Sequence, residues 1–173
     1  MKDKLERKLP PLPLKLKNEI LEKGILKTVP AGTELLREGQ YVKVVPLVLE
    51  GLIKVFGSYE DRELLLYYIE PTESCIMSFS AGLWNAPSKV FAVTERDSEL
   101  LLLPVQLMNE WVKEYPSLNN LFFQQFAKRY EDLLLTIHHL LFDKMDKRLY
   151  EFLKMKSELF GETTLDLRHH QIA

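Results

Sequence analysis

The spacing of hydrophobic and polar residues divides the chain into three parts, the first of which is helical. Between Pro13 and Gly24 the apolar positions fall close to one helical stripe, and Gly24 is a stop signal, so a short helix is predicted. The preceding residues 1–13 are charged and then proline-rich, which indicates a loosely docked arm rather than part of a core. The stripe consists of Leu14, Leu16, Ile20 and Leu21.

The second part, from Ile25 to Pro104, has the pattern of strands and turns. Short runs rich in Val, Ile, Leu, Tyr and Phe are interrupted by turn-forming sequences at a spacing of roughly ten residues. This pattern predicts an all-β sandwich or jelly roll, with residues 41–57 and 62–71 as its central strands.

After Pro104 the pattern becomes helical. A short helix is expected up to Pro116, followed by a long helical tract opened by Ser117 as N-cap. Along this tract apolar residues recur at alternating three- and four-residue steps, the a/d spacing of a coiled coil. This ridge consists of Phe123, Phe126, Tyr130, Leu133, Ile137 and Leu140.

The ridge has two interpretations. It could pack onto the chain's own β domain, or it could pair with a second copy. A second apolar face favours pairing, because a helix that is apolar on two sides needs two partners. That face consists of Phe122, Leu134, Leu135 and Leu141. We therefore expect a homodimer through the ridge.

Composition and charge limit the expected partners and the expected location of the protein. The 173 residues carry a net charge of −2, which gives no global attraction for nucleic acid or an anionic membrane. The single cysteine, Cys75, cannot form an internal disulfide, and no signal peptide opens the chain, so a cytoplasmic location is expected. Apolar runs are too short to span a bilayer, so no membrane partner is expected.

Catalytic and metal-binding patterns are not found in the sequence. His138 and His139 are neighbours on a helix and point about 100° apart, as do His169 and His170, so neither pair is expected to chelate one metal as an i, i+4 pair would. A cupin-like enzyme is disfavoured because the β segment contains no histidine. We therefore expect no enzyme activity, no metal and no cofactor.

Several sequence motifs lie in order along most of the chain. They are VPAGTELLREGQ, LVLEGLIKVF, RELLLYYIEPTESC, the loop around Pro87, LLLPVQLMNEWVKEYP and DKRLYEFL. These motifs and the order of elements resemble the Crp/Fnr family of bacterial transcription regulators. The final LRHHQIA is similar to the first helix of that family's helix-turn-helix. The resemblance implies a mainly β fold with α elements: a cyclic-nucleotide-binding-like jelly roll, or double-stranded β-helix, followed by a long dimerisation helix.

The resemblance also implies a domain organisation and a function. Residues 1–24 would form the arm and short helix, 25–116 the jelly roll with its short helix, 117–160 the dimerisation helix and the next helix, and 161–173 the start of a truncated helix-turn-helix. The chain would be the effector-sensing and dimerisation region of a regulator that reaches DNA only through the missing C-terminal helix-turn-helix. The alternative is a freestanding jelly-roll module that binds a small ligand or another protein.

The resemblance also places an effector pocket after Ser74, and this pocket departs from the family pattern. Cyclic-nucleotide-binding relatives have a Gly-Glu pair for the ribose and an arginine for the phosphate. Alignment on Pro87 puts Ser78 and Phe79 at the first positions and Ser88 at the last, so cAMP and cGMP are expected to bind poorly. The candidate pocket residues are Ser78, Phe79, Ser80, Leu83, Trp84, Asn85, Ser88, Lys89, Phe91, Leu133 and Leu134.

Two alternatives remain for this pocket. Its side chains could line a site for an apolar effector, or they could pack against one another and fill it. Lys89 is next to the vacant arginine position, where it could contact an anion or face solvent. The effector is therefore either an unknown small molecule or none.

Overall fold

The structure is a computed structural model that describes residues 2–60, 62–161 and 164–165. It divides into two compact units, residues 1–129 and residues 130–173, and the boundary falls inside one long helix. The proposed start of a helix-turn-helix at 161–173 lies largely outside the described residues.

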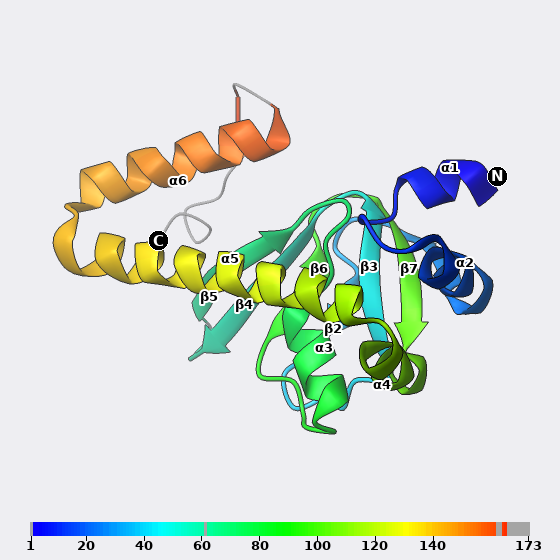
Figure 1. Ribbon diagram of the computed structural model, residues 1–173. Helices are drawn as coiled ribbons and strands as arrows, with labels where there is room; N and C mark the ends of the chain where they lie inside the picture. Colours follow the sequence, from blue (N-terminus) through cyan, green and yellow to red (C-terminus); the bar gives the residue numbers. More distant parts are fainter. Residues whose placement is uncertain (1, 61, 162–163, 166–173) are drawn as a thin grey trace. The chain divides into compact units, whose positions relative to one another are not determined.

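Two antiparallel sheets form the centre of the first unit, which confirms the predicted jelly-roll fold (Figure 1). One sheet has the strand order β1-β7-β3 and the other β2-β6-β4-β5. A buried core of Val48, Ile53, Ile69 and Leu100 holds apolar side chains of both sheets. The strands are β1 (Ile25–Val29), β2 (Glu34–Leu36), β3 (Val44–Glu50), β4 (Ile53–Tyr59), β5 (Arg62–Ile69), β6 (Phe91–Thr94) and β7 (Ser98–Pro104).

The prediction of the central strands is wrong in part. Although β3 and β5 are rich in apolar residues, each lies at an edge of its sheet, and the inner strands are β4, β6 and β7. Apolar content reports burial of a strand's faces, whereas position in a sheet depends on pairing between distant segments. β3 and β4 are joined through Gly51, which has a φ of 99° and no room for a side chain beside Ser98.

The described residues contain six helices. They are α1 (Lys2–Arg7), α2 (Leu14–Lys23), α3 (Ile76–Leu83), α4 (Val105–Glu114), α5 (Pro116–Phe142) and α6 (Met145–Phe160). The predicted short helices α2 and α4 and the long helix α5 are confirmed, but α5 begins at Pro116 rather than after Ser117. Proline suits a first helical position, because its fixed φ is helical and its missing N–H would have no partner there. No helix among the described residues combines the length and apolar character that crossing a bilayer requires.

The N-terminal arm is not loosely docked, contrary to the prediction. Leu9 and Leu12 are buried and belong to the same hydrophobic cluster as Trp111 of α4. The Lys8 ammonium also pairs with Glu50 at 2.7 Å and Glu99 at 2.6 Å, which ties the arm to β3 and β7. The buried leucines of this segment, rather than its charges and prolines, therefore determine that it packs on the core.

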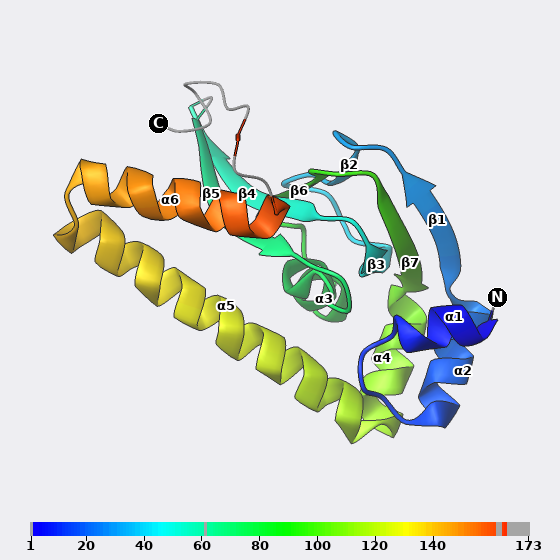
Figure 2. The ribbon, with the colours of Figure 1, turned by 90° about the horizontal axis from the view of Figure 1, so that it is seen from above.

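α2 and α4 are joined by a polar contact beside this core, and the two helices lie side by side near the arm (Figure 2). The carboxylate of Glu19 accepts hydrogen bonds from the Tyr115 hydroxyl at 2.6 Å and from the Trp111 indole N–H at 2.9 Å. These hydrogen bonds lower the pKa of Glu19 to about 2, with the Tyr115 hydroxyl contributing most.

Candidate functional site

The predicted pocket loop contains a helix, α3, between Ile76 and Leu83. Its residues are small or apolar on every side, so they carry no amphipathic period that distinguishes a buried helix from a loop. The Cys75 thiol caps the helix by accepting a hydrogen bond from the Ser78 backbone N–H at 3.4 Å. Gly82 lets α3 approach α4 closely, because a Cβ there would lie 2.7 Å from the Val105 side chain.

The segment after α3 is held by backbone hydrogen bonds to a neighbouring turn. Asn85 adopts a φ of 47°, in the left-handed region that asparagine tolerates. Ser88 donates its N–H to the Gln40 carbonyl and accepts from the Gly39 N–H, both at 2.8 Å. The Ser88 hydroxyl is buried and donates to the Val90 carbonyl at 2.9 Å. The polar groups of Ser88 therefore hydrogen-bond to the backbone of its own loop and of the neighbouring turn.

A hollow of about 260 Å³ opens between α3 and this segment. Of the candidate pocket residues, Ser80, Trp84 and Lys89 line it, together with Met77, Ala81, Ala86 and Pro87. Trp84 is 76% exposed and Lys89 is also exposed, so an indole and an ammonium group border a mostly apolar floor.

Two other candidates on α3, Ser78 and Phe79, point into the protein and are buried. The ring of Phe79 stacks on the ring of Phe122 in α5, with 3.7 Å between the centroids and 4° between the planes. Both rings belong to the same core cluster as Trp111. Phe79 is therefore a packing residue in this structure.

The remaining candidates do not gather at the hollow. Leu83 is 37% exposed at the end of α3, and Phe91 stacks on Phe56 of β4 with 5.3 Å between ring centroids. Leu133 and Leu134 belong to the second unit, where both are about half exposed. The roles of these residues stay predictions.

The N-terminal half of α5 contacts α3 and the residues just before α3 through one side of the helix. Phe122 stacks on Phe79, and the Gln125 amide oxygen accepts a hydrogen bond from the Ser74 N–H at 3.1 Å. One turn further on, the Arg129 guanidinium pairs with the Glu73 carboxylate at 2.5 Å. We call Phe122, Gln125 and Arg129 the coupling stripe.

The coupling stripe ends in a half-buried charged cluster. Burial by itself raises the pKa of Glu73, but hydrogen bonds from Lys128 and the Glu70 N–H, with the charge of Arg129, hold the pKa of this carboxyl below its usual value. Arg129 also lies over the Tyr67 ring, 4.5 Å from its centroid. Burial raises the pKa of the Tyr67 hydroxyl, which stays protonated.

The sequence analysis places Phe122 on the second apolar face, but it misses Gln125, Arg129 and their partner Glu73. The members of the coupling stripe follow each other at steps of three and four residues, the same helical spacing as the ridge. The signal was therefore present, but a stripe that ends in Gln and Arg is normally interpreted as a solvent-exposed face.

Comparisons with known proteins identify the fold. No protein-family model matches the chain, and no curated protein sequence matches it significantly. Among solved structures, a protein described as a transcriptional regulator of the crp/fnr family from Eubacterium rectale has a TM-score of 0.82 and 24% identity, over 93% of this chain and 75% of that chain. The c-di-GMP responsive global regulator of Xanthomonas campestris has a TM-score of 0.72 and 18% identity, over 82% and 71% of the two chains.

A third solved structure matches a shorter stretch. The regulatory domain of Toxoplasma gondii PKA, crystallised with cAMP, has a TM-score of 0.57 and 23% identity, over 63% of this chain and 43% of that chain. The resemblance that the sequence motifs predict is confirmed at the level of the fold. The chain therefore shares the fold of these structures, a cyclic-nucleotide-binding-like jelly roll followed by a long helix.

Proposed function

We propose that this chain is the effector-sensing and dimerisation region of a Crp/Fnr-type transcription regulator. The observation that carries the proposal is the match over 93% of the chain to a regulator of that family, which extends beyond the jelly roll into the helices. Binding to DNA would then require a helix-turn-helix, of which residues 167–173 resemble the first helix.

Exposure along α5 supports a dimer. Phe123 is 71% exposed and Tyr130 63%, while Phe122, next to Phe123, is 4% exposed in the core. The ridge residues Phe126, Leu133 and Ile137 are exposed as well. Such a row of apolar side chains at a/d spacing is the pattern by which two helices pair. A second copy of α5 would remove it from water.

A matched pair of substitutions tests this dimer. Leu133 is at a seam position and is 48% exposed, whereas Leu135 is two residues on, off the seam, and is 58% exposed. Static light scattering at tens of micromolar should report about twice 20.3 kDa for the unmodified chain and for Leu135→Glu. Leu133→Glu should shift the mass toward 20.3 kDa, because a carboxylate would be buried in an apolar seam.

The outcomes separate the two functional candidates. A monomeric unmodified chain would contradict the dimer and favour a freestanding module, whose exposed ridge would bind another protein. A dimer disrupted equally by both substitutions would contradict pairing through the ridge.

We further propose that this jelly roll does not respond to cyclic nucleotides. Phe79, at the position of the ribose-binding glutamate, is stacked in the core, and the Ser88 hydroxyl at the arginine position bonds to the Val90 carbonyl. Loss of each charge-assisted hydrogen bond costs about 1.5–3 kcal/mol, so losing both partners weakens a micromolar site about 100-fold or more. The hollow of about 260 Å³ is also small, below the about 300–1,000 Å³ typical of ligand pockets.

Isothermal titration with cAMP and cGMP tests this proposal directly. No heat of binding is expected at ligand concentrations of about 100 μM. Saturable binding in the low micromolar range would contradict the substituted pocket while leaving the dimer proposal untouched.

A further inference from the structure

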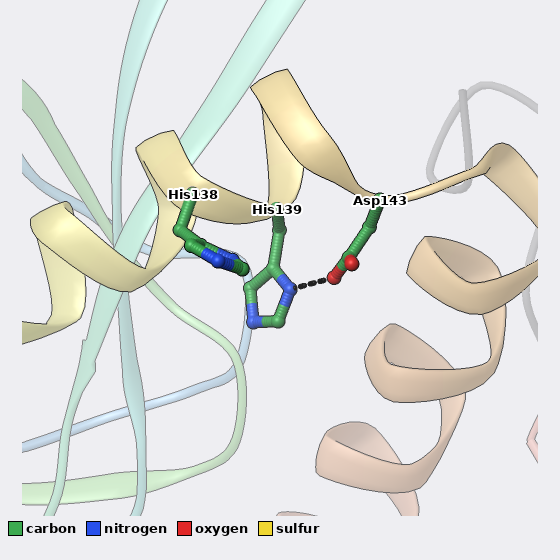
Figure 3. Close-up of side chains that lie close together, drawn as sticks. All are labelled: His138, His139 and Asp143. Atoms are coloured by element: carbon green, nitrogen blue, oxygen red, sulfur yellow. Dashed lines mark hydrogen bonds and ion pairs between the residues drawn. The ribbon is translucent and has the colours of Figure 1, made fainter.

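His138, His139 and Asp143 lie together where α5 ends (Figure 3). Each offers one potential ligand atom, and these atoms lie within 4.8 Å of one another. The His139 Nδ1 is 2.5 Å from an Asp143 carboxylate oxygen, and the rings of His138 and His139 meet edge to face with 5.9 Å between centroids. The sequence predicts no metal site from the two histidines alone, and Asp143, which follows the last helical residue of α5, is the third possible ligand.

The cluster is accessible and partly preorganised. His138 is exposed, and the His139 side chain is 37% exposed, so an ion from solvent can reach the ring nitrogens. The Asp143 side chain is only 8% exposed and is anchored through its other oxygen by Lys147, at 2.8 Å. The carboxylate is therefore held in place beside the His139 ring before any ion binds.

We propose that His138, His139 and Asp143 bind one divalent first-row transition metal ion of the zinc type, with water completing the coordination. Two imidazole nitrogens and one carboxylate oxygen are ligands that such ions prefer over Mg²⁺ or Ca²⁺, which favour oxygen alone. Ligands about 2.0–2.2 Å from a tetrahedral ion lie about 3.3 Å from one another. The His139–Asp143 pair must therefore open slightly and the His138 ring must move inward, which are side-chain rotations at an exposed helix end.

The site depends only on residues of the second unit and is independent of the proposed regulator function. A bound ion would fasten the segment after α5 to the last turn of that helix. Lys147 opposes the ion, because its ammonium group holds the same carboxylate.

Isothermal titration calorimetry of the full chain with Zn²⁺ tests the site. Absorption spectra of the Co²⁺-loaded chain report the geometry of the ligands. One ion per chain is expected. His138→Ala, His139→Ala and Asp143→Asn should each weaken binding at least about 10-fold, with circular dichroism showing unchanged folding.

The chain supplies a matched control in its other histidine pair, because it has only four histidines. The double substitution His169→Ala/His170→Ala removes equal imidazole content and should leave Zn²⁺ affinity unchanged. The proposal is overturned if this control abolishes binding, if any ligand substitution leaves the affinity unaltered, or if the unmodified chain binds no Zn²⁺.

A further variant examines the carboxylate itself. Lys147→Gln removes the competing positive charge and should tighten Zn²⁺ binding several-fold. Weaker binding in this variant would contradict ligation by Asp143.

Discussion

Replacing Phe79 by alanine distinguishes a filled pocket from a ligand cavity. Phe79 is 7% exposed, and its ring stacks on Phe122, which is 4% exposed. Removing a buried phenylalanine ring costs about 3–5 kcal/mol of unfolding free energy. About 0.5–1.5 kcal/mol of that cost belongs to the contact between the two rings. Because small proteins are stable by only about 5–15 kcal/mol, the loss should be obvious.

The measurement is urea denaturation followed by far-ultraviolet circular dichroism, at one fixed protein concentration because a dimer's stability depends on it. Trp84→Ala is the control, since this aromatic residue ends the same helix but is 76% exposed. It should change the unfolding free energy by less than about 0.5 kcal/mol. A Phe79→Ala cost below about 1 kcal/mol would refute tight packing at this position. Phe79 would then be available to line an effector site.

Two further predictions concern the charged helix contact and a turn. Glu19 has a pKa lowered from 4.5 to about 2 by Tyr115 and then Trp111, so the stability it contributes is present above pH 4.5 and is lost as the pH falls toward 2. Glu19→Gln should flatten this loss in melting temperatures measured across that range; an unchanged acid profile would contradict the contact. Gly51→Ala should destabilise by more than about 1 kcal/mol in urea denaturation, because φ is 99° and the Cβ would meet Asp97 O at 2.7 Å. Gly57→Ala, where a Cβ meets nothing within 4 Å, is the control, and equal costs for the two would contradict the strain at Gly51.

The fold was predictable because its signals are local. Turn residues at regular intervals mark the strands, and the three- and four-residue steps mark α5, so both follow from the order of residues alone. α3 has no such local signal, because Ile76–Leu83 is small or apolar throughout and shows no helical period. The docking of the N-terminal arm has no local signal either, because burial of Leu9 depends on a partner, Trp111, far along the chain.

The site was less predictable because it depends on contacts between distant segments. Glu73 and Arg129 are 56 residues apart, and nothing local to either indicates their ion pair. Ser88 illustrates the reverse case, since the frequent local role of a turn serine, hydrogen bonding to its own backbone, is the one the structure shows. His139 and Asp143, four residues apart, could have been paired from helical spacing, although Asp143 follows the end of the helix.

Burial of the only cysteine gives this protein a built-in reporter of opening. Cys75 is completely shielded at the start of α3, and burial raises the pKa of its thiol, so a thiol reagent cannot modify it while the jelly roll stays closed. The rate of modification therefore measures how often the segment that carries Glu73 and α3 separates from the sheets. An effector that acts on this segment would slow or accelerate the labelling of Cys75, so its action would be measurable without a DNA-binding assay.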